Sequence, residues 1–219
     1  AVKYAEEKGV LLVHAAGNDN EDVDKVDNFP NKYYETEETI AYKKKKEKPP
    51  VAIRPLNNQG QGMGNPDFNR IDRVKPVTDT IRFAFAHAKN WVEVGASAYK
   101  DEDLLKANFS NYGKRNVDVF APGYLINSTI PNSKYDEHDG TSMAAPVVSG
   151  LSALILSYYP HLTPAQVREI LIRSVTKINR KVKYTNERGE SVRVPFADIT
   201  LSGGIVNAYN ALKLAETYK

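Results

Sequence analysis

The chain contains no cysteine among its 219 residues. Disulfide bonds, a catalytic thiolate and zinc sites built on cysteine are therefore all excluded. Neither sign of charge dominates, because 30 Lys and Arg residues against 27 Asp and Glu residues leave a net charge of only +3. This near balance argues against a dedicated nucleic-acid-binding protein. No apolar run reaches the length expected of a membrane-spanning helix, and no signal peptide is visible.

The composition that is present, 41% hydrophobic and 26% charged residues, is that of a globular domain with a sizeable core. Residues 1–8 have the pattern of the end of an amphipathic helix, which Gly9 would stop as a C′ glycine. Residues 10–15 (VLLVHA) form an apolar run typical of a strand buried on both faces of a parallel sheet. A helix leading into such a strand implies a βαβ unit whose first strand precedes Ala1. We therefore expect the N-terminal part of the domain to lie outside this chain.

Residues 35–90 differ in character from the rest. They contain a lysine run at 43–46, two consecutive prolines and a glycine-rich patch at 60–64. Such punctuation predicts an insertion or flexible loop, with residues 81–88 as a short strand or helix end. A lid, an exosite and a processing loop are the functional alternatives to a solvated loop.

Elsewhere strands and helices alternate, which predicts an α/β fold with a doubly wound, mostly parallel sheet and helices on both faces. We expect residues 1–219 to form one such domain, incomplete at its N-terminal side. Thr163 and Gln166 predict a capping box at the start of a helix, with Pro164 at its first position. The predicted strands are 91–97, 117–121 and 125–129, and the other predicted helices are 142–159, buried all round, and 205–216.

The strongest chemical signal is the heptapeptide GTSMAAP at residues 140–146. It places Ser142 at the N-terminus of a long helix, where free N–H groups and the helix dipole favour negative charge. A nucleophile for acyl transfer suits this position, because an oxyanion forms beside it. A lone serine before a helix is more often only an N-cap, and the full heptapeptide is what favours the nucleophile.

A second signal, AAGN at residues 15–18, directly follows the predicted strand. Ligands of open α/β sheets bind beyond the carboxyl ends of the strands. Asn18 therefore lies where a site is expected, and its side-chain amide can donate a hydrogen bond to an oxyanion. The simpler alternative is an Asx-turn after a strand.

Together these segments resemble the subtilisin-like serine proteases. The likeness covers residues 1–34 and 91–217 and includes the strand and turn segments 107–113, 117–123 and 126–129. It implies a serine endopeptidase that cleaves peptide or protein substrates through an acyl-enzyme on Ser142, with Asn18 in the oxyanion hole. It also implies that no cofactor is required and that the protein is secreted or held in the cell envelope.

The resemblance extends to the substrate pocket. Ala15, Ala16 and Gly17 would form one wall of the pocket for the residue preceding the scissile bond. Asn28 would lie near its base, followed by Phe29 and Pro30 in a turn with a cis peptide bond. We expect this pocket to accept uncharged side chains of medium to large size.

The Asp and His that complete the family's triad precede the serine in the chain, and neither of their segments occurs here. A serine hydroxyl is a weak nucleophile without a base. His14 reads as a satisfied core residue, while His87 and His161 fall in an insertion and a turn. His138 lies four residues before Ser142, too close along a tight turn for its ring to be aimed well.

We therefore expect the chain to be inactive alone and to need the N-terminal part of the catalytic domain as its partner. The alternative function is a pseudoprotease or peptide-binding module without catalysis. An α/β-hydrolase is excluded, since its nucleophile occurs in the pattern Gly-x-Ser-x-Gly.

No metal-binding motif stands out. Carboxylates at positions 19, 21, 22, 24 and 27 form an acidic stretch after Asn18. Oxygen ligands with this spacing suit calcium, and a solvated acidic loop is the simpler interpretation. A structural calcium ion elsewhere, as family members often carry, also stays open.

Overall fold

The computed structural model describes residues 1–26, 30–34, 86–99, 105–186 and 189–218. The chain divides into two compact units, residues 1–32 with 88–219, and residues 33–87. In the smaller unit, β2 (Tyr33–Tyr34) pairs antiparallel with β3 (Ala86–His87). Most of the predicted insertion at 35–90 lies outside the described residues, so its role stays a prediction.

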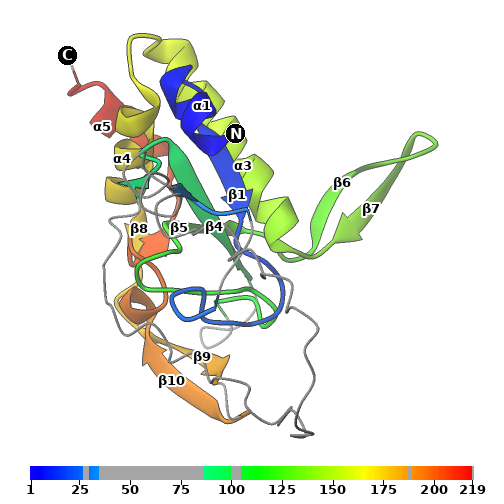
Figure 1. Ribbon diagram of the computed structural model, residues 1–219. Coiled ribbons are helices and arrows are strands. Elements are labelled where there is room, and N and C mark those ends of the chain that lie inside the picture. Colours follow the sequence, from blue (N-terminus) through cyan, green and yellow to red (C-terminus); the bar gives the residue numbers. More distant parts are fainter. Residues whose placement is uncertain (27–29, 35–85, 100–104, 187–188, 219) are drawn as a thin grey trace, which may run out of the picture. The chain divides into compact units, whose positions relative to one another are not determined.

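A five-stranded sheet forms the centre of the larger unit, in the order β1-β4-β5-β11-β8 (Figure 1). All neighbouring pairs run parallel except β11 with β8. The predicted α/β class with a mostly parallel sheet is therefore confirmed. The strands are β1 (Leu12–Ala15), β4 (Trp91–Ser97), β5 (Val119–Pro122), β8 (Thr176–Lys177) and β11 (Gly204–Ile205).

Strands β1 and β4 differ in burial. Every residue of β4 is buried, whereas every residue of β1 is only partly buried. The prediction that residues 10–15 are buried on both faces is therefore wrong for this chain. The cause is position, since β1 lies at the edge of the sheet and pairs only with β4 among the described strands.

Helix α3 (Thr141–Tyr158) packs one face against the sheet, through Ala144, Val148, Leu151 and Ile155. Its other face is open, so the prediction of a helix buried all round is wrong. The helix is also apolar and long enough to cross a membrane, contrary to the sequence-based expectation, although its packing on β1, β4 and β5 is that of a core helix.

The remaining helices begin and end where local signals place them. Helix α1 (Val2–Glu7) is followed by Gly9 at φ +69°, the left-handed conformation expected of a C′ glycine. Helix α4 (Pro164–Arg173) opens with the predicted capping box between Thr163 and Gln166. Helix α5 (Ala208–Ala215) starts three residues later than predicted, because Ile205 belongs to β11.

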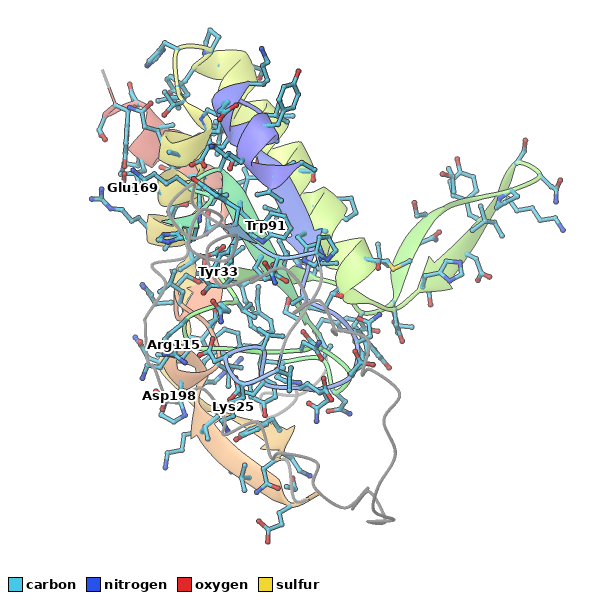
Figure 2. All side chains as sticks on the ribbon, viewed as in Figure 1. Lys25, Tyr33, Trp91, Arg115, Glu169 and Asp198 are labelled. Atoms are coloured by element: carbon cyan, nitrogen blue, oxygen red, sulfur yellow. The ribbon has the colours of Figure 1, made fainter. Side chains whose placement is uncertain are left out.

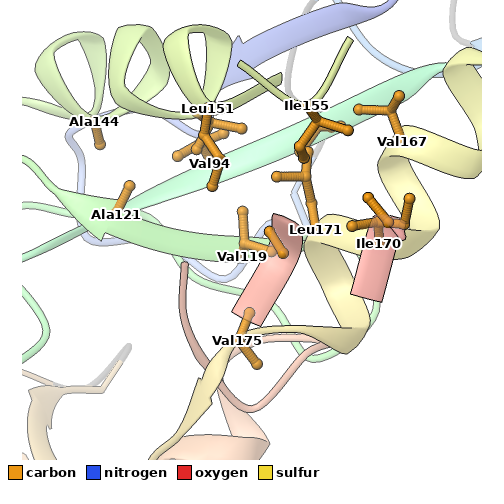
Figure 3. Packing of buried hydrophobic residues seen from close by; sticks show 14 of the residues in the cluster. Val94, Val119, Ala121, Ala144, Leu151, Ile155, Val167, Ile170, Leu171 and Val175 are labelled. Atoms are coloured by element: carbon orange, nitrogen blue, oxygen red, sulfur yellow. The ribbon is translucent and has the colours of Figure 1, made fainter. Parts of the chain in front are cut away.

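One apolar cluster joins α3, α4 and α5 to the sheet (Figure 3). Val94 and Val119 from the strands meet Leu151 of α3 and Ile170 of α4. An ion pair joins α4 to the residue before β5, since Arg168 of α4 donates a hydrogen bond to the buried Asp118 carboxylate at 2.5 Å. These contacts fix the helix that carries Ser142 to the sheet.

A second cluster is built on Phe120, whose ring meets Phe196 edge-on at 5.1 Å between centroids. Phe196 begins the short 3₁₀ helix η2 (Phe196–Asp198), which follows the antiparallel pair β9 (Lys181–Thr185) and β10 (Ser191–Pro195). Val182 of β9 and Ala16 are buried in the same cluster. The loop after β1 is thereby anchored at its first residue.

A β-hairpin connects β5 to α3, and the sequence analysis predicted only the first of its two strands. Strands β6 (Ile126–Ile130) and β7 (Lys134–His138) pair antiparallel along their full length. All five residues of β7 are exposed, and the hairpin extends away from the sheet in Figure 1. The predicted strand at 125–129 is confirmed, and β7 was missed.

Gly95 of β4 is a glycine of the sheet that larger residues should not replace without strain. A Cβ there would lie 2.6 Å from the Phe120 ring, so Gly95→Ala should lower the free energy of unfolding by about 1–3 kcal/mol. Gly150→Ala is the matched control. Nothing lies within 4 Å of its Cβ position in α3, and the change should stabilise by about 0.5–1 kcal/mol. Chemical denaturation measures both, and equal effects would contradict this packing.

Candidate active site

Ser142 lies in the first turn of α3, directly after a glycine turn. The Gly140 N–H donates to the Gly123 carbonyl at 2.8 Å, which joins this turn to the end of β5. Ser142 itself is exposed, and among the described residues its hydroxyl has no hydrogen-bond partner. The helix N-terminus thus presents a free hydroxyl next to backbone N–H groups.

The Asn18 side chain is held against the same turn. Its Oδ1 accepts hydrogen bonds from the Thr141 backbone N–H and from the Thr141 hydroxyl, both at 3.0 Å. The Thr141 hydroxyl in turn accepts from the Gly17 N–H at 3.1 Å. Because Oδ1 takes two donors, the Nδ2 group must be the one that points away from Thr141.

Two hydrogen-bond donors lie close together beside Ser142. A Cβ placed on Gly140 would lie 3.5 Å from Asn18 Nδ2 and 3.6 Å from the Ser142 backbone nitrogen, with Met143 Sδ at 3.3 Å. Both groups therefore border one small region of space in front of α3. Asn18 Nδ2 bonds to no described residue, so it is available to an oxygen atom placed there. An oxyanion would be stabilised by such a pair of donors.

The structure thus brings together Ser142 and Asn18, the two predicted catalytic residues. Thr141, which the sequence analysis did not single out, is the link between them. It is buried, with 1% of its surface exposed, although it belongs to the first turn of α3. Its place directly before the serine in the GTSMAAP string was the available signal.

The predicted pocket wall is described only in part. Ala15 ends β1, and the Ala16 side chain is fully buried in the second apolar cluster, so Ala16 offers no side-chain surface to a substrate. Gly17 adopts φ +101°, which favours glycine. Asn28 and Phe29 lie outside the described residues. The pocket therefore stays a prediction.

Among the described residues of the larger unit, no histidine is hydrogen-bonded to Ser142. The Nδ1 atom of His14 lies 2.9 Å from the Glu93 carboxylate, and its ring packs on Trp91 at 4.9 Å between centroids (Trp91 is labelled in Figure 2). His161 Nε2 lies 3.2 Å from the Tyr218 carbonyl oxygen. His138 is exposed at the end of β7 and makes no hydrogen bond to Ser142.

Two carboxylates of the acidic stretch after Asn18, those of Asp22 and Asp24, are paired with protein groups, and residue 27 lies outside the described residues. The Asp24 carboxylate accepts the backbone N–H groups of Arg115 at 2.9 Å and Asn116 at 2.9 Å, and Lys25 pairs with Asp22 (Figure 2 labels Arg115 and Lys25). In the described part of the chain, no three His, Asp or Glu side chains are grouped as metal ligands. Calcium binding stays a prediction.

Lys106 is a buried cation beside this loop. Its ammonium donates to Asn20 Oδ1 at 2.8 Å and to the Ala107 carbonyl at 3.0 Å, and 1% of its surface is exposed. Burial lowers the pKa of the Lys106 ammonium to about 7. The ammonium connects the loop that carries Asn18 to the segment leading into residue 111.

This lowered pKa makes stability depend on pH. Between about pH 7 and 10 the unfolded lysine keeps its proton while the folded one loses it, so the free energy of unfolding should rise with pH. The slope from this group is at most about 1.4 kcal/mol per pH unit. Denaturation at several pH values measures it, and Lys106→Met should remove that rise. An unchanged slope in the variant would contradict the assignment.

Comparison with known proteins finds relatives of this chain both by sequence and by fold. A family model described as "Subtilase family" matches residues 1–191. Subtilisin NAT of Bacillus subtilis subsp. natto is 46% identical over 79 residues, which are 36% of this chain and 20% of that protein. A thermostable alkaline protease of Halalkalibacterium halodurans is 38% identical over 136 residues, 62% of this chain and 35% of that protein. The matched segments thus span about a fifth to a third of these curated relatives.

Solved structures show the same fold at lower identity. The prenylagaramide maturation protease PagA superposes with a TM-score of 0.56 at 20% identity, covering 98% of this chain and 53% of that one. A structure of the subtilase cytotoxin SubAB assembly gives a TM-score of 0.59 at 19% identity, covering 98% and 52%. At these identities the likeness concerns the fold alone.

Proposed function

Because the chain belongs to the subtilase family, we propose that it supplies the nucleophile and the oxyanion hole of a serine endopeptidase. Ser142 Oγ attacks the carbonyl carbon of a peptide bond. The resulting oxyanion accepts hydrogen bonds from Asn18 Nδ2 and the Ser142 backbone N–H. The observation that carries this proposal is that the nitrogens of both donors lie within 3.6 Å of the Cβ position of Gly140, beside the free hydroxyl.

The rest of the cycle needs a base. A histidine takes the Ser142 proton as the C–O bond forms and gives it to the leaving amine as the C–N bond breaks. Water then attacks the acyl-enzyme, the same histidine takes its proton, and the serine is released with its proton restored. Within the described residues of the larger unit no histidine is hydrogen-bonded to Ser142, and we assign the histidine and its aspartate to the N-terminal part of a catalytic domain outside this sequence.

Two adjoining surfaces support docking of that part here. The edge of β1 that pairs with no described strand can accept a further parallel strand, as edge strands readily do. Next to it, the open face of α3 exposes Val147, Leu154 and Tyr158 at 38%, 39% and 68%. The helix and the edge strand pack on each other, so one partner could cover both. An exposed apolar face of this kind marks an interface.

The alternative is a pseudoprotease or peptide-binding module, which the unpartnered Ser142 hydroxyl favours. A serine-reactive fluorophosphonate probe separates the two functions. We expect Ser142 to be labelled in the protein that contains the Asp–His part, and to react far more slowly in this chain alone. Absence of labelling in both would contradict the endopeptidase and leave the binding module.

The proposal also covers the substrate and the cellular location of the protein. We propose that the substrate is a peptide or protein chain, with an uncharged residue before the scissile bond. Profiling of peptide libraries tests this, and a strict requirement for Lys or Arg would contradict it. We also propose a secreted or cell-envelope location, which cell fractionation tests directly.

A further inference from the structure

The side chain of Asn111 holds the loop that carries Asn18 from both sides. Its Nδ2 donates to the Ala16 carbonyl at 2.9 Å, before Asn18. Its Oδ1 accepts the N–H groups of Asp19 at 3.0 Å and Glu21 at 2.9 Å, after Asn18. The Asn111 backbone N–H adds a fourth bond, to the Gly17 carbonyl at 2.9 Å. Asn111 therefore bonds to four of the five other residues between positions 16 and 21.

The fit between Asn111 and the loop leaves no free volume. A Cβ on Gly17 would lie 2.5 Å from Asn111 Nδ2, so the amide occupies the space that any larger residue at 17 would need. Asn111 is buried, with 3% of its surface exposed. A buried amide with both of its ends bonded has one orientation. The backbone on either side of Asn18 is thus fixed to a rigid neighbour.

We propose that Asn111 is a positioning residue for the oxyanion donor Asn18, an inference that rests on the proposed endopeptidase function. Its side chain is bonded to the loop backbone and has no part in the reaction itself. Thr141 sets the rotation of the Asn18 amide, and Asn111 sets the place of its backbone. A displacement of a catalytic group by about 1 Å can lower the rate about a hundredfold.

The test uses the protein that contains the Asp–His part, with rates expressed per titrated active site. Asn111→Leu removes all the side-chain bonds at nearly the same volume, and kcat should fall about tenfold to a hundredfold with KM changed less than about threefold. Asn111→Asp keeps the acceptor for Asp19 and Glu21 but buries a charge and places a carboxylate oxygen against the Ala16 carbonyl oxygen, so kcat should fall with it as well. Affinity for a peptide boronic acid, which forms a tetrahedral adduct, should fall in parallel with kcat/KM.

A double-mutant cycle asks whether Asn111 acts through Asn18. In an Asn18→Ala background, Asn111→Leu should cost little further rate, because the donor that it positions is gone. Fully multiplicative effects would overturn the proposal. So would a loss of thermal stability with kcat per active site unchanged.

Asn116→Leu is the matched control. Asn116 Nδ2 donates to the Val23 carbonyl at 3.0 Å, which is the same kind of bond farther along the loop, so kcat should stay unchanged. If Ser142→Ala leaves activity intact, the endopeptidase function itself fails. If Ser142→Ala abolishes activity but Asn111→Leu does not lower it, only the positioning role fails. Hydrogen exchange on the unaltered protein adds a test free of folding defects, since rapidly exchanging Asp19 and Glu21 amides would overturn the proposal.

Discussion

Replacing Ser142 with alanine in the protein that contains the Asp–His part should lower kcat about a million-fold, a magnitude measured on subtilisin, which is a member of the same family. The change removes only the atom that would form the acyl-enzyme. The Asn18 amide and the start of α3 stay in place, so KM should change little. Steady-state kinetics on a peptide substrate measure both constants.

Ser149→Ala is the matched control for this variant. Ser149 lies two turns further along α3, is also exposed, and donates its hydroxyl to the Ala145 carbonyl at 3.1 Å. The same chemical change there should leave kcat unaltered. Equal losses in the two variants, or residual activity within about tenfold of the unaltered protein after Ser142→Ala, would contradict the nucleophile assignment.

Asn18→Asp should lower kcat about a hundredfold to a thousandfold, again a magnitude taken from subtilisin. The substitution keeps an oxygen for the Thr141 N–H and hydroxyl to donate to, so the turn at Gly140 stays closed. It replaces the Nδ2 donor with a second carboxylate oxygen, which cannot donate to an oxyanion while ionised. The expected signature is a fall in kcat with KM nearly constant.

A matched control for the added charge is Asn132→Asp. Asn132 lies in the turn between β6 and β7 at φ +67°, a conformation that Asp also tolerates. Activity should not change there. A rate loss in Asn132→Asp as large as that in Asn18→Asp would indicate a general charge effect instead of a lost donor.

Local signals in the sequence were enough to predict those helix ends whose caps are formed by neighbouring residues. The capping box at Thr163 and Gln166 and the glycine after α1 are formed by residues a few positions apart, and both are confirmed. Short strings also singled out Ser142 and Asn18, which the structure places side by side, while their catalytic roles stay predictions. Their meeting could be expected because parallel strands end at one edge of a sheet.

Features that depend on distant residues could not be predicted in this way. Asn111 is separated from the loop that it holds by about ninety positions, and nothing in residues 107–113 shows that its amide faces Ala16. Whether β1 and the second face of α3 are exposed depends on which other elements pack against them. Their apolar composition shows only that these residues could be buried. Strand β7 carries five exposed residues, so its sequence has no apolar alternation to reveal it.

The base of the β6–β7 hairpin is closed by two hydrogen bonds, from Gly140 N–H to the Gly123 carbonyl and from Leu125 N–H to the Asp139 carboxylate at 2.6 Å. Both bonds lie at the base of the hairpin, between it and Ser142, and the turn at its tip, residues 131–133, contributes to neither. The tip is therefore the part of this segment whose length and sequence can change, for example by adding an affinity tag, with the least effect on the position of Ser142.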